Sequence, residues 1–417
     1  MSSKINLRKL LLMVTMLFPI TTIIERYLGF LNKSLLVVSL FLLFVITLQN
    51  GKVKRKSFIF ACFSILTYCI SLFISPMAAI KINPNMAVYY IFLILYYLFF
   101  IDQKQKIEKD LLDLRNYIFI IVVSYTVFLT LTIFLPGSHI AISAGGWGDD
   151  RYFASFSNSP NRVGPACLFI MVLLIYLLRF GKKREWLFIL MLPQIYAGLA
   201  GGSRTYFALI LTAALIYIYY WLHPKKIFWL TIIPITLIVF YFVGRSSMMT
   251  KIEISLSYLG TGNTYEFWRR LTNSRSVLWP ERINAYKGFT TFHKLFGAGV
   301  NYTSYTFGLW SHDDFIEILC SYGIIGLANY CFIMFKLYKT FVNKNAPLFM
   351  KLLVVFIWLF NATFNFFYCY FNAVLCYPIL LITLHEGDWE GLKLRDKERV
   401  DKTEHIIEAA KRVSENE

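Results

Sequence analysis

Long apolar segments with few or no charged residues recur along almost the whole chain. An α-helix needs roughly 20 mostly apolar residues to cross the ~30 Å hydrocarbon core of a bilayer. By this rule we expect about twelve transmembrane helices in an all-α, polytopic integral membrane protein. The predicted helices lie near residues 10–24, 35–49, 58–75, 86–101, 116–136, 163–179, 186–201, 206–222, 227–243, 314–335, 349–368 and 371–385. We expect residues 1–385 to form the membrane domain and residues 386–417 a charged cytoplasmic tail.

The composition narrows the class of protein further. Hydrophobic residues make up 57% of the chain and charged residues 16%, whereas a soluble domain has about 45–50% apolar and about 25% charged residues. This balance excludes a soluble enzyme, a disordered chain and a disulfide scaffold. The net charge of +18 does not indicate a nucleic-acid partner, because few basic residues lie in soluble sequence. We expect membrane lipid as a partner and no nucleic acid.

The positions of Lys and Arg predict the orientation. Basic residues gather in the short cytoplasmic loops of membrane proteins. With both termini inside, about two thirds of the 42 basic residues fall on the cytoplasmic side. A cleaved signal peptide is the alternative for the first segment, but Glu25-Arg26-Tyr27 follows it without a small-x-small site. Two long loops, about 137–162 and 244–313, are then extracytoplasmic, and we expect short helices in the second.

Arg204 is the first candidate for chemistry. It lies in the short predicted outer turn GLAGGSRTYF. An Arg near the membrane core is costly unless it is paired, so it is a candidate functional residue. The alternative is an interfacial Arg whose charge reaches the lipid headgroups. A guanidinium suits phosphate because it offers bidentate charged hydrogen bonds.

His312 opens the predicted tenth helix, in the stretch SHDDFIE. Ser311 as N-cap with Asp314 three residues later resembles a capping box, and acidic residues complement the helix dipole. This structural explanation leaves out His312 and Glu317. Because His accepts a proton near neutral pH, we regard His312 as a candidate catalytic base, oriented by Asp313 or Glu317.

The two outer loops supply further candidates. On a helix, Arg275, Trp279 and Arg282 would share one face, and Pro280 argues against that helix unless it sits in a first turn. The alternatives are a solvated basic face and an anionic substrate held beside aromatic rings. In the shorter loop, Arg151 is followed by a turn signal that ends at Asn161.

No motif indicates a cofactor or a metal. The seven Cys residues lie in apolar spans without a C-x-x-C motif or a His partner, which favours packing over metal or redox chemistry. There is no P-loop and no G-x-G-x-x-G. Asp149-Asp150 lacks further ligands and is weak support for a divalent ion. We therefore expect no metal and no cofactor.

Four segments together resemble the O-antigen polymerase and O-antigen ligase superfamily of bacterial envelope glycosyltransferases. The segments are RYFASFSNSPNRVG from Arg151, GGSRTYF around Arg204, SRSVLW followed by LFGAGV in the long loop, and His312 with Gly323 and Gly326 at the ligase spacing. Asp313 stands where that pattern has a small residue or Asn. The segments occur in the family's order, and the resemblance covers about 151–326 and the long loop.

The resemblance implies a reaction, a location and partners. The donor would be an undecaprenyl-pyrophosphate-linked oligosaccharide, processed at the extracytoplasmic face of the bacterial cytoplasmic (inner) membrane without a nucleotide sugar. Arg204, with Arg151, Arg275 or Arg282, would stabilise the pyrophosphate, and His312 would take the acceptor proton. A flippase and a chain-length regulator would be partner proteins.

Three functions remain open from the sequence. The first is a polymerase for O-antigen, capsule or exopolysaccharide, which transfers a glycan chain to a sugar hydroxyl of another lipid-linked repeat unit. The second is a ligase that uses a different acceptor. The third is a lipid-linked oligosaccharide flippase, although such transporters usually bind near the midplane between repeated halves, and no repeat is evident in this chain. A non-catalytic assembly scaffold is a further alternative.

Overall fold

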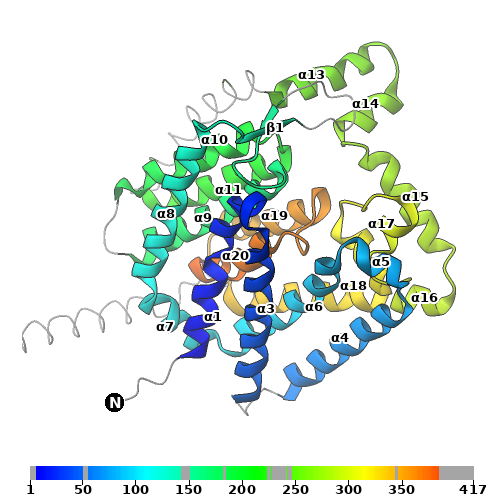
Figure 1. Ribbon diagram of the computed structural model, residues 1–417, viewed down its shortest axis with the longest axis horizontal. Helices are drawn as coiled ribbons and strands as arrows, with labels where there is room; N and C mark the ends of the chain where they lie inside the picture. Colours follow the sequence, from blue (N-terminus) through cyan, green and yellow to red (C-terminus); the bar gives the residue numbers. More distant parts are fainter. Residues whose placement is uncertain are drawn as a thin grey trace, which may run out of the picture.

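The computed structural model describes residues 6–49, 55–141, 151–181, 185–222, 247–342 and 346–384, with the isolated positions 227 and 241 (Figure 1). Within these residues, six helices are long and apolar enough to cross a membrane. They are α3 (Glu25–Gln49), α4 (Arg55–Ile74), α6 (Pro84–Asp102), α8 (Arg115–Ile133), α9 (Pro160–Phe180) and α18 (Asp314–Phe341). Shorter apolar helices accompany them: α10 (Leu192–Ala200) after the 3-10 helix η1 (Glu185–Met191), α11 (Arg204–Trp221), α19 (Leu348–Phe364) and α20 (Phe371–Thr383). The chain is accordingly an α-helical membrane protein.

Helix α4 shows why water is not the solvent around this fold. Its buried side chains are small and polar: Ser57, Ser64, Thr67 and Ser71. Its exposed side chains are large and apolar, and include Phe58, Ile59, Phe63, Leu66 and Phe73. A soluble helix has the opposite polarity, whereas small residues facing other helices and apolar residues facing outward are typical of a lipid environment.

The first two predicted spans have different boundaries from those expected. The first is divided into α1 (Leu7–Met16) and α2 (Phe18–Ile23), and Pro19 stands in the first turn of α2. The second, predicted at 35–49, begins at Glu25. Glu25 and Arg26 are tolerated at the start of α3 because Arg26 donates hydrogen bonds to the carbonyls of Gly137 and Ser157, at 2.7 and 3.0 Å.

At the start of α1, a polar cluster joins the chain to a short amphipathic helix, α7 (Lys104–Asp113). Arg8 pairs with Asp110 at 2.9 Å and Lys9 with Asp113 at 2.6 Å. Glu25 follows α1 and α2 at the other end. At 1.5 Å per residue, roughly 25 Å of helix separates this cluster from Glu25.

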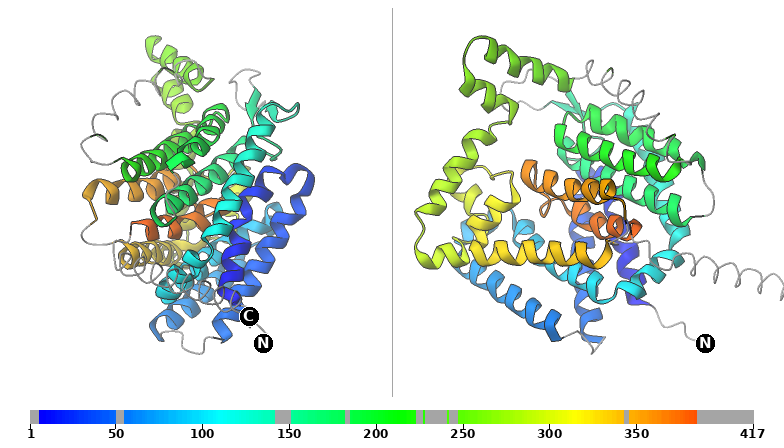
Figure 2. Two further views of the ribbon diagram at one scale, coloured as in Figure 1. Left: turned by 90° about the vertical axis from the view of Figure 1, so that its left-hand side faces the viewer. Right: turned by 180° about the vertical axis from the view of Figure 1, so that it is seen from behind.

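Helix α9 lies at the centre of the bundle, where it packs against α2, α8, α10, α11 and α20 (Figure 2). Its side chains are buried along almost the whole length of the helix. Helix α18 crosses beside this bundle and packs against α6 and α4. The segments that carry the candidate site precede α9, α11 and α18, so the core fixes where these segments meet.

The long loop forms short helices, as expected. They are α13 (Ser247–Gly260), α14 (Thr264–Leu271), α15 (Arg275–Lys287), α16 (Thr291–Phe296) and α17 (Tyr302–Phe307), which form one side of the molecule in Figure 1. Helix α15 continues through Pro280. The shorter loop contains an unpredicted two-stranded antiparallel sheet of β1 (His139–Ala141) and β2 (Arg151–Phe153). Most of the predicted span 227–243 and the tail 386–417 lie outside the described residues.

Two glycines join the long loop to α18. Gly323 has φ +70° and interrupts the helix, and a Cβ there would lie 2.3 Å from the carbonyl oxygen of Leu295. Gly297, with φ +84°, would meet the backbone of Ser321 at 2.3 Å. The amide of Ala298 donates to the carbonyl of Cys320 at 2.8 Å. Gly297 and Gly323 therefore permit a close backbone contact between LFGAGV and α18, which a side chain at either position would prevent.

Candidate functional site

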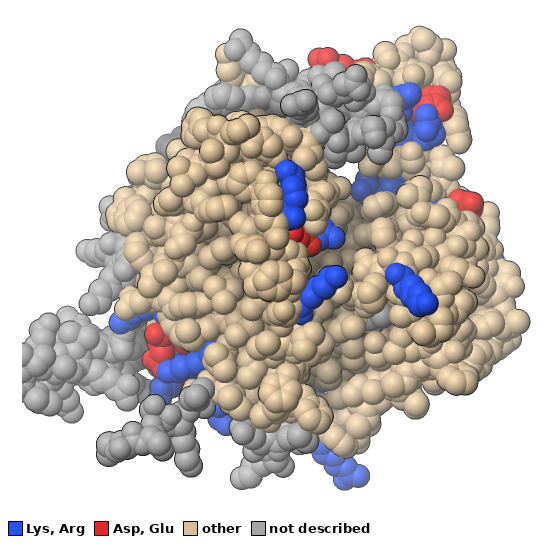
Figure 3. Space-filling model, viewed as in Figure 1, with Lys and Arg blue, Asp and Glu red and all other residues tan. Residues whose placement is uncertain are grey.

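Two cavities meet at His312, which lines both of them. The larger, about 420 Å³, is here called the arginine cavity, and it lies among the starts of α9, α11 and α15, the turn before α11 and the segment before α18. The smaller, about 250 Å³, is called the Glu25 cavity, and it lies among α2, α3, α6, α9 and α20. The face shown in Figure 3 is largely uncharged, and basic atoms are visible in the hollow beside the side formed by α13–α17.

Four arginines line the arginine cavity, and among the described residues no carboxylate lines it. Arg269 is paired with Glu266 at 2.8 Å, and the Nε of Arg270 lies 3.6 Å from the same carboxylate. Within the described part of the chain, Arg204 and Arg275 form no ion pair with a carboxylate. Arg275 donates from Nη1 to the carbonyl of Thr272 at 3.1 Å, and its buried Nε has no hydrogen-bond partner. The cavity therefore holds more positive charge than its own residues compensate.

The positive charges act on one another across the cavity. Burial, followed by the charge of Arg204, lowers the pKa of Arg275 to about 10. Arg275 remains protonated at neutral pH, and the effects of burial and Arg204 on its pKa outweigh those of Tyr370 and Asp313, which raise it. A bound anion would add a further counter-charge.

The turn before α11 adds backbone donors. Gly201, Gly202 and Ser203 line the arginine cavity, and Ser203 is the N-cap of α11 with no side-chain capping bond. Gly202 has φ +66°, a conformation that favours glycine. The first N–H groups of a helix and its dipole attract anions. The start of α11 thus adds to the charge of Arg204 and Arg275.

His312 lies in a strained backbone segment that its neighbours hold in place. Its φ is +53°, which is uncommon for a residue other than glycine. Trp279 Nε1 donates to the carbonyl of Ser311 at 3.0 Å, and Arg282 Nη2 donates to the carbonyl of Leu309 at 3.1 Å. Glu317 accepts hydrogen bonds from both the amide and the hydroxyl of Ser311, at 3.1 and 2.9 Å.

These contacts separate the predicted site residues into two groups. Arg204, Arg275 and His312 line the arginine cavity, together with the predicted Asn161. Trp279, Arg282 and Glu317 are not among the lining residues of either cavity and instead hold the backbone beside His312. The Arg282 side chain is 1% exposed, and its guanidinium stacks on the ring of Phe307 at 4.4 Å.

Asp313 is the N-cap of α18, so the prediction that Ser311 caps this helix is wrong. The Asp313 carboxylate accepts a hydrogen bond from the Ile316 amide at 2.8 Å. The Ser311 hydroxyl instead contacts Glu317 at 2.9 Å and the carbonyl of Asp313 at 2.9 Å, and it caps no amide inside α18. Burial raises the pKa of Asp313 to about 6. For Arg151, only the backbone in β2 is described.

His312 is neutral at physiological pH. Burial, followed by the charges of Arg275 and Arg282, lowers its pKa to about 4. Its ring lies against Phe366, with the ring centroids 5.1 Å apart. A neutral imidazole has a lone pair that accepts a proton, so His312 is in the protonation state that a general base requires.

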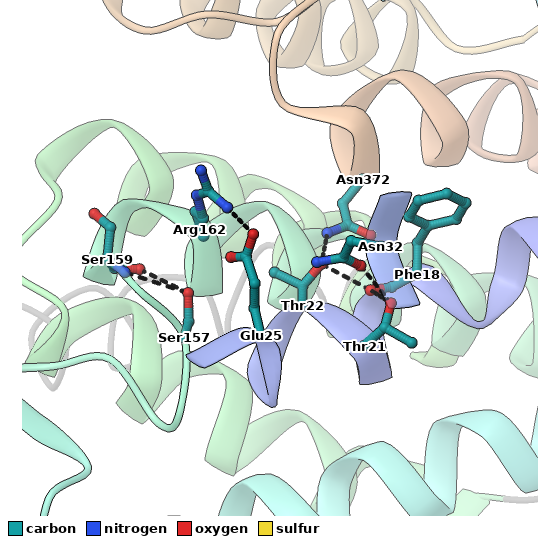
Figure 4. Close-up of polar contacts among 9 residues, drawn as sticks. All are labelled: Phe18, Thr21, Thr22, Glu25, Asn32, Ser157, Ser159, Arg162 and Asn372. Carbon is teal, nitrogen blue, oxygen red and sulfur yellow. Dashed lines mark hydrogen bonds and ion pairs between the residues drawn. The ribbon is translucent and has the colours of Figure 1, made fainter. Parts of the chain in front are cut away.

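The Glu25 cavity contains residues that the sequence did not single out. In the sequence, Glu25 bears only on signal cleavage, and no motif marks Arg162 or Trp310 as a ligand-binding residue. The sequence feature that could have indicated this cavity is the carboxylate of Glu25, which lies between two apolar segments. In Figure 4, Arg162 points toward Glu25, and the Asn372 amide donates to Thr22 Oγ1 at 2.9 Å.

Among the described residues, no group of three or more His, Cys, Asp or Glu side chains could hold a metal ion. Asp149 and Asp150 lie outside those residues. Comparisons of the chain with protein-family models, with curated proteins and with solved structures find no match.

Proposed function

We propose that this chain is a polysaccharide polymerase of the bacterial cytoplasmic membrane. It transfers a glycan chain from undecaprenyl pyrophosphate to a sugar hydroxyl of another lipid-linked repeat unit. The observation that carries the proposal is the arginine cavity, which holds uncompensated cations beside a neutral histidine. A pyrophosphate leaving group and a hydroxyl that must lose a proton need these two features.

The cavity matches a diphosphate in charge and in geometry. Arg204 and Arg275 offer planar, bidentate donors to phosphate oxygens, and the start of α11 adds backbone N–H groups. Negative charge grows on the pyrophosphate as its bond to the sugar breaks. Donors placed in advance for that charge stabilise the transition state more than the ground state.

The chemical step needs one base and one leaving group. The acceptor hydroxyl oxygen forms a bond to the anomeric carbon of the donor sugar, and His312 takes the hydroxyl proton. The bond from that carbon to the phosphate oxygen breaks, and its electron pair leaves with undecaprenyl pyrophosphate. Because the leaving group is already an activated diphosphate, the step requires no nucleotide sugar.

The proposed topology has about twelve spans, cytoplasmic termini and an extracytoplasmic loop between spans nine and ten. Two observations support it. Arg8 and Lys9, each paired with an aspartate of α7, lie at the start of α1, where the positive-inside rule places the cytoplasm. Glu25, which lines one of the two cavities, follows α2 at the other end. The transfer would thus occur at the outer face.

Glycan gel profiles test this function. Cells that rely on this chain should lose full-length polymer when it carries Arg204→Ala or His312→Ala at normal membrane abundance. Full-length polymer from both variants would refute the proposal. Purified wild-type protein should also form polymer from lipid-linked repeats, whereas flipping without polymer formation would favour a transporter.

A further inference from the structure

We propose that the Glu25 cavity is a carbohydrate subsite that holds the acceptor sugar with its reacting hydroxyl toward His312. This inference rests on the proposed function and deepens it, since it assigns a binding site to the second substrate. The cavity shares His312 with the arginine cavity, so ligands in the two cavities would approach the same imidazole from different directions.

Three buried polar atoms in the residues that line this cavity have no hydrogen-bond partner. They are Glu25 Oε2, Asn372 Oδ1 and Trp310 Nε1. The Glu25 side chain is 10% exposed and Asn372 is 5% exposed. Buried polar groups are nearly always satisfied, and leaving one unpaired costs about 1–3 kcal/mol. Two acceptors and one donor around one cavity therefore indicate a ligand that supplies both donors and acceptors.

Sugar hydroxyls supply both, because each one donates and accepts. Glu25 Oε2 and Asn372 Oδ1 would accept from two hydroxyls, and Trp310 Nε1 would donate to a third oxygen. The rings of Phe366 and Tyr370, which also line the cavity, offer apolar faces to the C–H side of a sugar ring. Hydroxyl binding thus uses every unpaired atom named above.

The two cavities differ in charge in a way that separates the substrates. In the Glu25 cavity, the carboxylate of Glu25 pairs with Arg162, and Lys33 is the other cation among the lining residues. Among the described residues, the arginine cavity is lined by four arginines and no carboxylate. A diphosphate is therefore directed to the arginine cavity, because its positive charge exceeds that of the Glu25 cavity, where Glu25 offsets one of the two cations. A neutral acceptor sugar needs no such excess of positive charge and suits the Glu25 cavity.

Neighbouring residues hold Glu25 and Asn372 in place (Figure 4). Arg162, in the first turn of α9, pairs with the other oxygen of Glu25, Oε1. The amide nitrogen of Asn372 donates to Thr22, whose hydroxyl donates in turn to the carbonyl of Phe18 at 2.7 Å. The oxygens assigned to the sugar are thus the ones that the protein leaves unused.

The test uses full-length protein in lipid vesicles with a fluorescent polymeric donor and an unlabelled single-repeat lipid-linked acceptor. Trp310→Phe keeps an aromatic ring and removes only the Nε1 donor. It should raise the acceptor KM about three- to tenfold and leave the donor KM within twofold, because one neutral hydrogen bond is lost. Glu25→Gln, which loses a charged acceptor, should raise the acceptor KM by about 10–100-fold.

Trp268→Phe is the matched control, because Trp268 is 53% exposed and lines neither cavity. Acceptor KM values within twofold of wild type for both Trp310→Phe and Glu25→Gln would overturn the subsite. The proposed function would survive that result if Arg275→Gln still lowered the transfer rate by about 10². Full transfer activity in Arg275→Gln would instead refute the proposed function, so the two failures are distinguishable.

Discussion

Replacing Arg275 with Gln tests the charge of the arginine cavity. The buried Nε of Arg275 has no hydrogen-bond partner, and in the part of the chain that the structure describes no carboxylate lines the cavity. Its charge is therefore available to a bound diphosphate. Loss of one preorganised charge-stabilising donor costs about 10²–10³ in rate, or about 2.7–4 kcal/mol. Because Arg204 remains in the cavity, we expect a loss of about 10², at the lower end of this range.

The same substitution should also change the pH profile. Arg275 is one of two cations whose charge lowers the pKa of His312. Without that charge the pKa of His312 rises, and the acidic limb of the rate should move to higher pH. A variant that had lost activity by misfolding would show no such displacement of the limb.

The assay is the release of undecaprenyl pyrophosphate by full-length protein in vesicles, measured from pH 4 to 8. Arg269→Gln is the control, because Arg269 lines the same cavity but is already paired with Glu266. It should cost less than about tenfold. The reasoning is refuted if Arg275→Gln retains more than a tenth of the wild-type rate, or if Arg269→Gln is equally damaging.

Three further predictions follow from the geometry. The acidic limb of kcat/KM should lie near pH 4, the pKa of His312 in the free enzyme. The acidic limb of kcat should lie at higher pH, because bound diphosphate offsets the arginine charges and so raises the pKa of His312. Acidic limbs of kcat and kcat/KM at the same pH would contradict this. Asp313→Asn keeps a good N-cap but removes a buried carboxylate whose pKa is raised to about 6. A raised carboxyl pKa means that folding stability falls as pH rises from about 4 to 6, so the variant should gain about 1–3 kcal/mol at pH 7.5 and nothing near pH 4. Thermal midpoints that are equal for Asp313→Asn and wild type, at pH 7.5 as well as near pH 4, would refute this. Gly323→Ala should destabilise the fold by more than about 1 kcal/mol, because its Cβ meets the Leu295 carbonyl and its φ is positive, whereas Gly260→Ala, in open space, serves as the control. An unchanged melting temperature in detergent for Gly323→Ala would contradict that explanation.

Much of the fold was predictable, because lipid imposes a simple rule on sequence. Apolar length locates helices such as α8 and α9 closely, since each must satisfy its own backbone in hydrocarbon. The same rule placed the start of α3 too late, because the charged residues Glu25 and Arg26 lower the hydropathy of its first turn. Their charges are compensated by Arg162 and by the carbonyls of Gly137 and Ser157, which are distant in sequence.

The candidate site was partly predictable for a related reason. Charged residues near membrane spans are few, so the sequence identifies Arg204, Arg275 and His312 as separate candidates. Their convergence, and the different positions of Trp279, Arg282 and Glu317, depend on how the long loop packs against α18. That packing rests on close backbone contacts at Gly297 and Gly323. Sequence spacing gives no measure of such contacts between distant segments.

The most direct test of the central claim is a single-turnover measurement on His312→Ala in vesicles with saturating lipid-linked donor and acceptor. A general base contributes about 10²–10⁴ to the rate. We predict that transfer slows by at least about 100-fold while the donor Kd stays within about threefold, because the arginines that bind the diphosphate are intact. Transfer at the wild-type rate would contradict the assignment of His312 and, with it, the proposed chemistry of the site.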